Sequence, residues 1–164
     1  MDADVWEDLY RKYYRSAVLY CIGLCSRQQL AEDIATDAFI KAYLSLPNDV
    51  TSFRDWLMKV CKNLWIDYLR KHSREVYDES FPTISDGTTP ETTYILNERN
   101  RCLWDIINTL PSFDREMLIL HYFSGLTLQE ISQLTGRTAP AVRTRMMRLR
   151  QTLKGKMEEY GYGI

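Results

Sequence analysis

The sequence predicts an all-α protein made of two small helical domains joined by a flexible acidic linker, with a helix-turn-helix in the second domain. Three observations lead to this prediction. Apolar residues recur at helical spacing through most of the chain, and no useful run alternates as a β-strand would. The 164 residues include only seven glycines, which suits helices joined by short turns. The helical rhythm has a break near the middle of the chain.

This break has the composition of a linker. In HSREVYDESFPTISDGTTPE, residues 72–91, Ser, Thr, Pro, Gly and acidic residues replace the apolar rhythm. It separates a first domain, residues 1–71, from a second, residues 92–164. A chain of this length can form two such domains, each with a core of its own.

Composition limits the classes of function. The chain is 45% hydrophobic and 26% charged, and no run approaches the roughly 18 apolar residues of a membrane span. The acidic N-terminus, MDADVWEDLY, lacks the apolar segment of a secretory signal, so we expect a cytoplasmic protein without membrane insertion. The cysteines form no CxxC pair, and we expect them to be small buried residues in a reducing compartment. They are Cys21, Cys25, Cys61 and Cys102.

Catalysis would require titratable side chains that converge on one site. The two histidines, His72 and His121, are far apart in sequence, and no nucleophile motif accompanies either of them. We therefore expect no enzyme, no metal site and no cofactor.

The basic residues are unevenly distributed. Seven of the 21 lie between Arg137 and Lys156 with no acid among them, and the 22 acids outnumber the basic residues elsewhere. Such asymmetry indicates a segment near the C-terminus that faces a polyanion.

These cations belong to a predicted helix-turn-helix. Thr127 and Glu130 have the spacing of a capping box, which starts a short helix. Gly136 ends that helix, Thr138 is a second N-cap, and Pro140 falls in the first turn of the next helix. Two helices joined by a short turn with glycine are typical of this motif.

The second helix of the motif has two different faces. One is a narrow apolar stripe that we expect to be buried, formed by Val142, Met146, Leu149 and Leu153. The opposite face carries Pro140, Thr144, Met147 and Gln151, flanked by Arg143, Arg148, Arg150 and Lys154. A polar, cationic face suits the major groove of DNA. The alternative is a solvated helical hairpin, which the lack of acids at i,i+4 disfavours.

The segment AEDIATDAFIKAYLSL predicts a helix with a protein-binding face. Its inner face is formed by Ala31, Ile34, Ala35, Ala38, Phe39 and Ala42. Its reverse face is formed by Asp33, Asp37, Ile40 and Leu44. Acids beside large aliphatic residues suit a basic protein partner. The alternative is a helix buried on both sides.

The segment FRDWLMKVCKNLWIDYLRK predicts a helix that combines cations with aromatic residues. Its inner stripe is formed by Phe53, Leu57, Val60, Cys61, Leu64 and Tyr68. Its outer stripe is formed by Lys59, Lys62, Asn63, Ile66 and Arg70, with Trp56 and Trp65 on the shoulders. This combination suits single-stranded or melted nucleic acid. An exposed helix whose tryptophans belong to the core is the alternative.

The segments just described, taken in order, resemble those of extracytoplasmic-function sigma factors. AEDIATDAFIKAY, FRDWLMKVCKNLWIDYLRK and LPSFDREMLILHYFSGLTLQEISQLTGRTAPAVRTRMMRLRQTL are similar to the core-binding, promoter-melting and minus-thirty-five-reading segments of that family. The resemblance implies region two in residues 1–71 and region four in residues 92–164. It also implies RNA polymerase core enzyme, promoter DNA and an anti-sigma factor as partners.

The resemblance also assigns residues to each surface. Those for core binding are Asp33, Asp37, Ile40 and Leu44. Those for the minus-ten element are Asn48, Ser52, Phe53, Trp56, Lys59, Lys62, Asn63, Ile66 and Arg70, with Asn63 and the loop SLPNDVTSF capturing a flipped base. Those for the minus-thirty-five element are Arg137, Thr138, Ala141, Arg143, Thr144, Arg145, Met147 and Arg148. The acidic linker would follow the RNA exit path.

A helix-turn-helix regulator that does not bind core polymerase is the alternative function. It would account for the arginines near the C-terminus. It would not account for the predicted docking face or the aromatic-cationic helix of the first domain.

Overall fold

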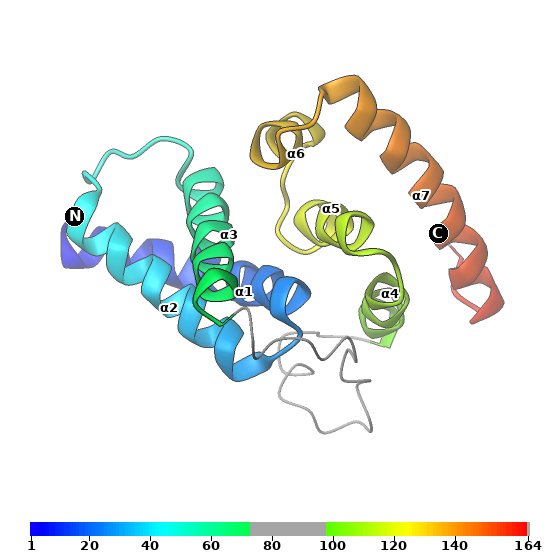
Figure 1. Ribbon diagram of the computed structural model, residues 1–164, viewed down its shortest axis with the longest axis horizontal. Coiled ribbons are helices and arrows are strands. Elements are labelled where there is room, and N and C mark those ends of the chain that lie inside the picture. The colour runs from blue at the N-terminus through cyan, green and yellow to red at the C-terminus, as the bar shows by residue number, and fades with distance from the viewer. Residues whose placement is uncertain (73–97, 164) are drawn as a thin grey trace. The chain divides into compact units, whose positions relative to one another are not determined.

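The computed structural model describes residues 1–72 and 98–163. The chain divides into two compact units, residues 1–83 and 84–164. Every regular element in the described ranges is an α-helix, as the sequence predicts (Figure 1). Apart from residue 72, the predicted linker lies outside the described residues.

The first unit packs three helices against one another: α1 (Ala3–Cys25), α2 (Gln28–Ser45) and α3 (Phe53–Lys71). Ser26 takes the left-handed conformation after α1 and turns the chain into α2. The inner face of α2 is buried as predicted. Its four alanines have no exposed surface, and such small side chains let α2 lie close to its neighbours. They are Ala31, Ala35, Ala38 and Ala42.

Aromatic rings join the three helices around Phe39. The Phe39 ring meets those of Trp6 and Tyr10 on α1 and that of Phe53 at the start of α3, with centroids 5.1 to 6.2 Å apart. Trp6 Nε1 also donates a hydrogen bond of 2.9 Å to the Phe39 carbonyl oxygen. Buried aromatic rings contribute large apolar area, so this cluster fixes the positions of α2 and α3 on α1.

The second unit contains α4 (Glu98–Asn108), α5 (Ser112–Tyr122), α6 (Leu128–Thr135) and α7 (Ala139–Glu159). Helices α6 and α7 form the predicted helix-turn-helix (Figure 1). The capping box is confirmed, because the Glu130 amide donates to Thr127 Oγ1 at 3.2 Å and the Thr127 amide donates to Glu130 Oε2 at 2.8 Å. Gly136 has φ +70° after α6, and Thr138 caps α7.

The apolar stripe of α7 is also confirmed. Val142, Met146, Leu149 and Leu153 are buried, and Met157 extends the stripe by one more turn. Helix α7 packs through this stripe against α4, α5 and α6. Its opposite side is therefore left on the surface of the unit.

The cysteines are less uniformly buried than predicted. Cys21 and Cys61 are buried, whereas Cys25 and Cys102 are half-buried, and all four are free thiols. Burial raises the pKa of the Cys21 thiol well above its ordinary value, which keeps that side chain in its unreactive form. No helix within residues 1–72 and 98–163 is long and apolar enough to span a membrane.

Replacing Thr127 with alanine removes the side-chain acceptor of the capping box. We expect this change to lower the free energy of unfolding of the second unit by about 0.5 to 2 kcal/mol. Urea denaturation followed by circular dichroism measures the change. Gln129→Ala, an exposed substitution in the same turn of α6, is the control and should have a much smaller effect.

Candidate nucleic-acid and protein interfaces

The exposed side of α7 contains the predicted DNA-reading residues. All eight residues predicted to read the minus-thirty-five element lie on the surface of the second unit. Met147 is 57% exposed, between Arg143 and Arg148 in sequence. This side of α7 therefore offers cations, a hydroxyl at Thr144 and an apolar contact to a partner.

Two residues of this set already make contacts at the start of the motif. The Thr138 hydroxyl accepts a hydrogen bond from the Ala141 amide at 3.4 Å, so it caps α7. The Arg137 guanidinium lies over the ring of Phe113 on α5, 4.0 Å from its centroid. The contact between Arg137 and Phe113 holds the turn between α6 and α7 against the first turn of α5.

Arg145 forms an ion pair that the sequence analysis did not anticipate. Its Nε donates to Oδ1 of Asp114 at 2.6 Å, across 31 residues of sequence. The Asp114 side chain is only 8% exposed, whereas that of Arg145 is 49% exposed. The hydrogen bond and the charge of Asp114 raise the pKa of Arg145. Asp114 lies in the first turn of α5, where a helix N-terminus also favours negative charge.

Arg150 is held in a related way at the other end of α5. Nδ1 of His121 lies 2.9 Å from the Leu126 carbonyl oxygen, and Nε2 of His121 lies 3.0 Å from Nη2 of Arg150. A carbonyl oxygen can only accept, so the hydrogen-bond partners assign the proton to Nδ1. Nε2 then accepts a hydrogen bond from Arg150.

The predicted docking face of α2 is exposed. Asp33 and Asp37 lie on the surface, Ile40 is 48% exposed and Leu44 is 76% exposed. The alternative of a helix buried on both sides is wrong for this unit. Tyr43 also belongs to this face and was not predicted; it is 46% exposed and follows Ile40 by three positions. That i,i+3 spacing was the signal that could have identified it.

The outer stripe of α3 is only partly on the surface. Lys59, Asn63 and Arg70 are exposed, whereas Lys62 and Ile66 are half-buried. Trp56 and Trp65 are also half-buried, and their rings stack on Phe53 and Tyr68 with centroids 6.0 and 5.7 Å apart. The tryptophans therefore contribute to packing as well as to the surface, and neither belongs to the fully buried core.

Two residues of the predicted minus-ten set, Asn48 in the loop and Phe53 at the start of α3, are already engaged in contacts within the unit. Phe53 is only 4% exposed because its ring belongs to the aromatic cluster around Phe39, so it supports the loop from inside. Asn48 is exposed, but its amide already bonds Asp2: Oδ1 accepts from the Asp2 amide and Nδ2 donates to the Asp2 carboxylate, each at 2.6 Å. Ser52 is exposed, with φ +58° before α3.

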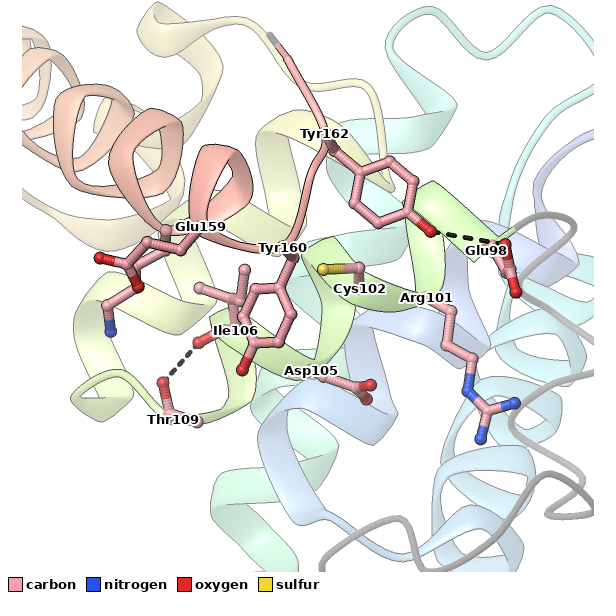
Figure 2. A pocket seen from close by; sticks show the side chains of 10 residues that line it. Glu98, Arg101, Cys102, Asp105, Ile106, Thr109, Glu159, Tyr160 and Tyr162 are labelled. Carbon is pink, nitrogen blue, oxygen red and sulfur yellow. Dashed lines mark hydrogen bonds between the residues drawn. The ribbon is translucent and has the colours of Figure 1, made fainter.

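A hollow of about 540 Å³ lies between α4 and the C-terminal end of α7 (Figure 2). Tyr162 Oη donates to Glu98 Oε2 at 3.4 Å across it (Figure 2). Asp105 and Lys156 line its wall. Burial raises the pKa of Asp105. Within the described ranges, no group of His, Cys, Asp and Glu side chains could hold a metal ion. None of the predicted DNA-reading residues lines this hollow.

Comparison with known proteins identifies related families and relatives. Residues 9–75 match the family Sigma-70 region 2, and residues 100–153 match the family Sigma-70, region 4. ECF RNA polymerase sigma factor SigW of Bacillus subtilis is 28% identical over 171 residues, covering 96% of this chain and 91% of the relative. RNA polymerase sigma factor YlaC of the same organism is 29% identical over 163 residues, covering 94% of this chain and 92% of the relative.

A solved structure has the same fold. It is the sigma factor RpoE from Bartonella quintana, in complex with the anti-sigma factor NepR, with a TM-score of 0.64 and 21% sequence identity. The match covers 93% of this chain and 96% of that chain.

The two matched regions, together with the helix-turn-helix, place the chain among the DNA-binding proteins of transcription. Region 2 precedes region 4 in this chain, as in the sigma factors that initiate transcription. The chain belongs to the sigma-70 family, as an extracytoplasmic-function sigma factor. The stand-alone helix-turn-helix regulator is not favoured, because such a protein would not explain the match of the first unit to region 2.

Proposed function

We propose that this sigma factor divides initiation among three helix faces. The exposed face of α2 binds RNA polymerase core enzyme, α3 with its preceding loop holds the opened minus-ten strand, and α7 reads the minus-thirty-five element. The observation that carries the proposal is that one chain contains both an exposed acidic and aliphatic face and a cationic helix-turn-helix.

The α2 face has the chemistry of a protein interface. Ile40, Tyr43 and Leu44 are large apolar side chains that remain on the surface although the inner side of the same helix is completely buried. Asp33 and Asp37 lie along the same helix and provide charges for a basic partner. An apolar patch with charged neighbours is typical of protein recognition, and here it supports docking on the polymerase.

The α3 surface has the chemistry of single-strand binding. Lys59 and Arg70 are exposed cations that can follow a phosphate backbone, and Asn63 lies between them in sequence. The amide of Asn63 can bond the edge of an extruded base. Asn48 fixes the loop to the N-terminus through Asp2, so we assign Asn48 to holding the loop in place rather than to binding a base.

The α7 surface has the chemistry of duplex recognition. Arg143 and Arg148 are exposed and can fork onto a guanine edge or a phosphate, and Met147 can contact a thymine methyl group. The structural relative bound to an anti-sigma factor supports a regulator of that kind as a further partner. We further propose that the protein acts in the cytoplasm and catalyses no reaction of its own.

The core-binding assignment predicts a loss of affinity when the charges of α2 are reversed. Changing both Asp33 and Asp37 to lysine should weaken core binding more than tenfold, because each lost pairing with a partner cation costs about 2 to 5 kcal/mol. Pull-down and titration with purified core enzyme measure this loss. The matched control changes Asp4 and Asp8, exposed acids four positions apart on α1, to lysine. Equal affinity of the α2 variant and the wild type, with unchanged circular dichroism, would refute the assignment.

The DNA-reading assignment predicts separate effects of two arginines. Arg143→Ala or Arg148→Ala should weaken promoter binding by about 1 to 3 kcal/mol and relax specificity at one position if the side chain reads a base. A phosphate contact would instead weaken all sequences and reduce the salt dependence. Lys156→Ala, on the same helix but in the hollow between α4 and the end of α7, is the control. Normal transcription from both arginine variants would remove α7 as the reader.

The melting assignment predicts a defect after closed-complex formation. Asn63→Ala should leave core binding intact and impair opening, because unstacking a base costs a few kcal/mol that its binding site must offset. Permanganate footprinting of the minus-ten region measures opening, and a premelted template should partly rescue the variant. Gln29→Ala, an exposed amide on α2, is the control. Wild-type reactivity of Asn63→Ala on duplex promoter would exclude Asn63 from melting.

A further inference from the structure

Helix α5 contacts three of the cations in and around the helix-turn-helix. Phe113 in its first turn lies under Arg137, Asp114 in the same turn bonds Arg145, and His121 in its last turn bonds Arg150. Arg145 and Arg150 flank the buried stripe of α7 on opposite sides at 3.6 residues per turn. The two ends of α5 thus hold α7 at both edges of its packed face.

The burial of Asp114 requires a partner for its carboxylate. A carboxylate that is 8% exposed is costly unless it is paired, and Arg145 Nε at 2.6 Å supplies the partner. Arginine has five N–H donors, and Nε accounts for one of them. Because the Arg145 side chain is half exposed, donors remain available at the surface.

His121 accepts a hydrogen bond from Arg150, as Asp114 does from Arg145. Its proton lies on Nδ1 and is donated to Leu126, so the lone pair of Nε2 faces the guanidinium of Arg150. Asp114 and His121 both accept from an arginine of α7. Within the described residues, no comparable side-chain hydrogen bond or ion pair holds the exposed Arg143 or Arg148.

We infer that Asp114 and His121 are positioning residues for DNA binding, which orient Arg145 and Arg150 toward backbone phosphates before DNA arrives. The inference rests on the proposed role of α7. An arginine that is already ordered loses less side-chain freedom on binding, which corresponds to about two- to tenfold in affinity for each side chain. Arg145 is thereby assigned to a phosphate contact rather than to a base.

Whether removal of the Asp114 charge weakens or strengthens DNA binding separates a positioning role from simple electrostatic repulsion. An acidic side chain near DNA repels phosphate, so by charge alone its removal should strengthen binding. If Asp114 positions Arg145, its removal should weaken binding instead. A purely structural role would lower stability without changing how binding depends on salt.

The experiment measures binding of the full chain to a fluorescent DNA duplex of mixed sequence at several salt concentrations, because phosphate contacts do not depend on sequence. Asp114→Asn keeps a neutral acceptor but loses the charge that strengthens the hydrogen bond to Arg145, so it should bind up to about tenfold more weakly than wild type. It should also lower the slope of log affinity against log salt by up to about 0.9, the value for one phosphate contact. Glu159→Gln removes an exposed acid from α7 itself and should leave affinity unchanged or higher.

A double-mutant cycle tests whether Asp114 acts through Arg145. Asp114→Asn combined with Arg145→Ala should bind no more weakly than Arg145→Ala alone. Additive losses, or affinity of Asp114→Asn equal to or above that of wild type, would overturn the inference for this pair.

His121→Asn provides an independent arm, which remains informative if Asp114→Asn does not fold. Asparagine keeps a donor near the Leu126 carbonyl but lacks an acceptor at the position of Nε2. This variant should lose as much affinity as Arg150→Ala, and unchanged binding would overturn the inference for His121.

If Arg148→Ala weakens binding while Asp114→Asn and His121→Asn do not, α7 still binds DNA and only the positioning inference fails. If the arginine variants of α7 all bind normally, the proposed function and the inference fail together.

Discussion

A bundle of three or four short helices must bury one stripe of each helix completely, because it has little other apolar surface from which to gain stability. In α2 this requirement is met by four alanines and Phe39, and in α7 by a stripe from Val142 to Met157. The residues on the other faces of these helices do not contribute to the core. The faces that we assign to polymerase and DNA are therefore those that packing leaves available.

The features that could be predicted from the sequence depend on neighbours within one or two turns. The apolar period of α7 fixed its buried stripe, and the Thr127 and Glu130 spacing fixed the start of α6, because a capping box closes within one turn. The exposed face of α2 followed from the same period. These features depend on interactions between residues close in sequence, so they can be predicted without knowledge of the tertiary contacts.

The features that could not be predicted depend on contacts between distant segments. Asn48 bonds Asp2 across 46 residues, Arg145 bonds Asp114 across 31, and His121 meets Arg150 across 29. Phe53 shows a second kind of limit. As the first residue of α3, it fits a surface loop and a buried stripe equally well by pattern, and only the packing of its ring on Phe39 decides.

The arginines of α7 show why a count of charges is a poor guide to a DNA interface. Arg145 stands next to a buried carboxylate, which offsets part of its charge, so its main contribution to DNA binding is a fixed geometry. Arg143 and Arg148 are exposed and contribute charge at the entropic cost of ordering a long side chain. Attraction and orientation are therefore provided by different arginines, and α5, which bears none of the predicted DNA-reading residues, determines which arginines supply orientation.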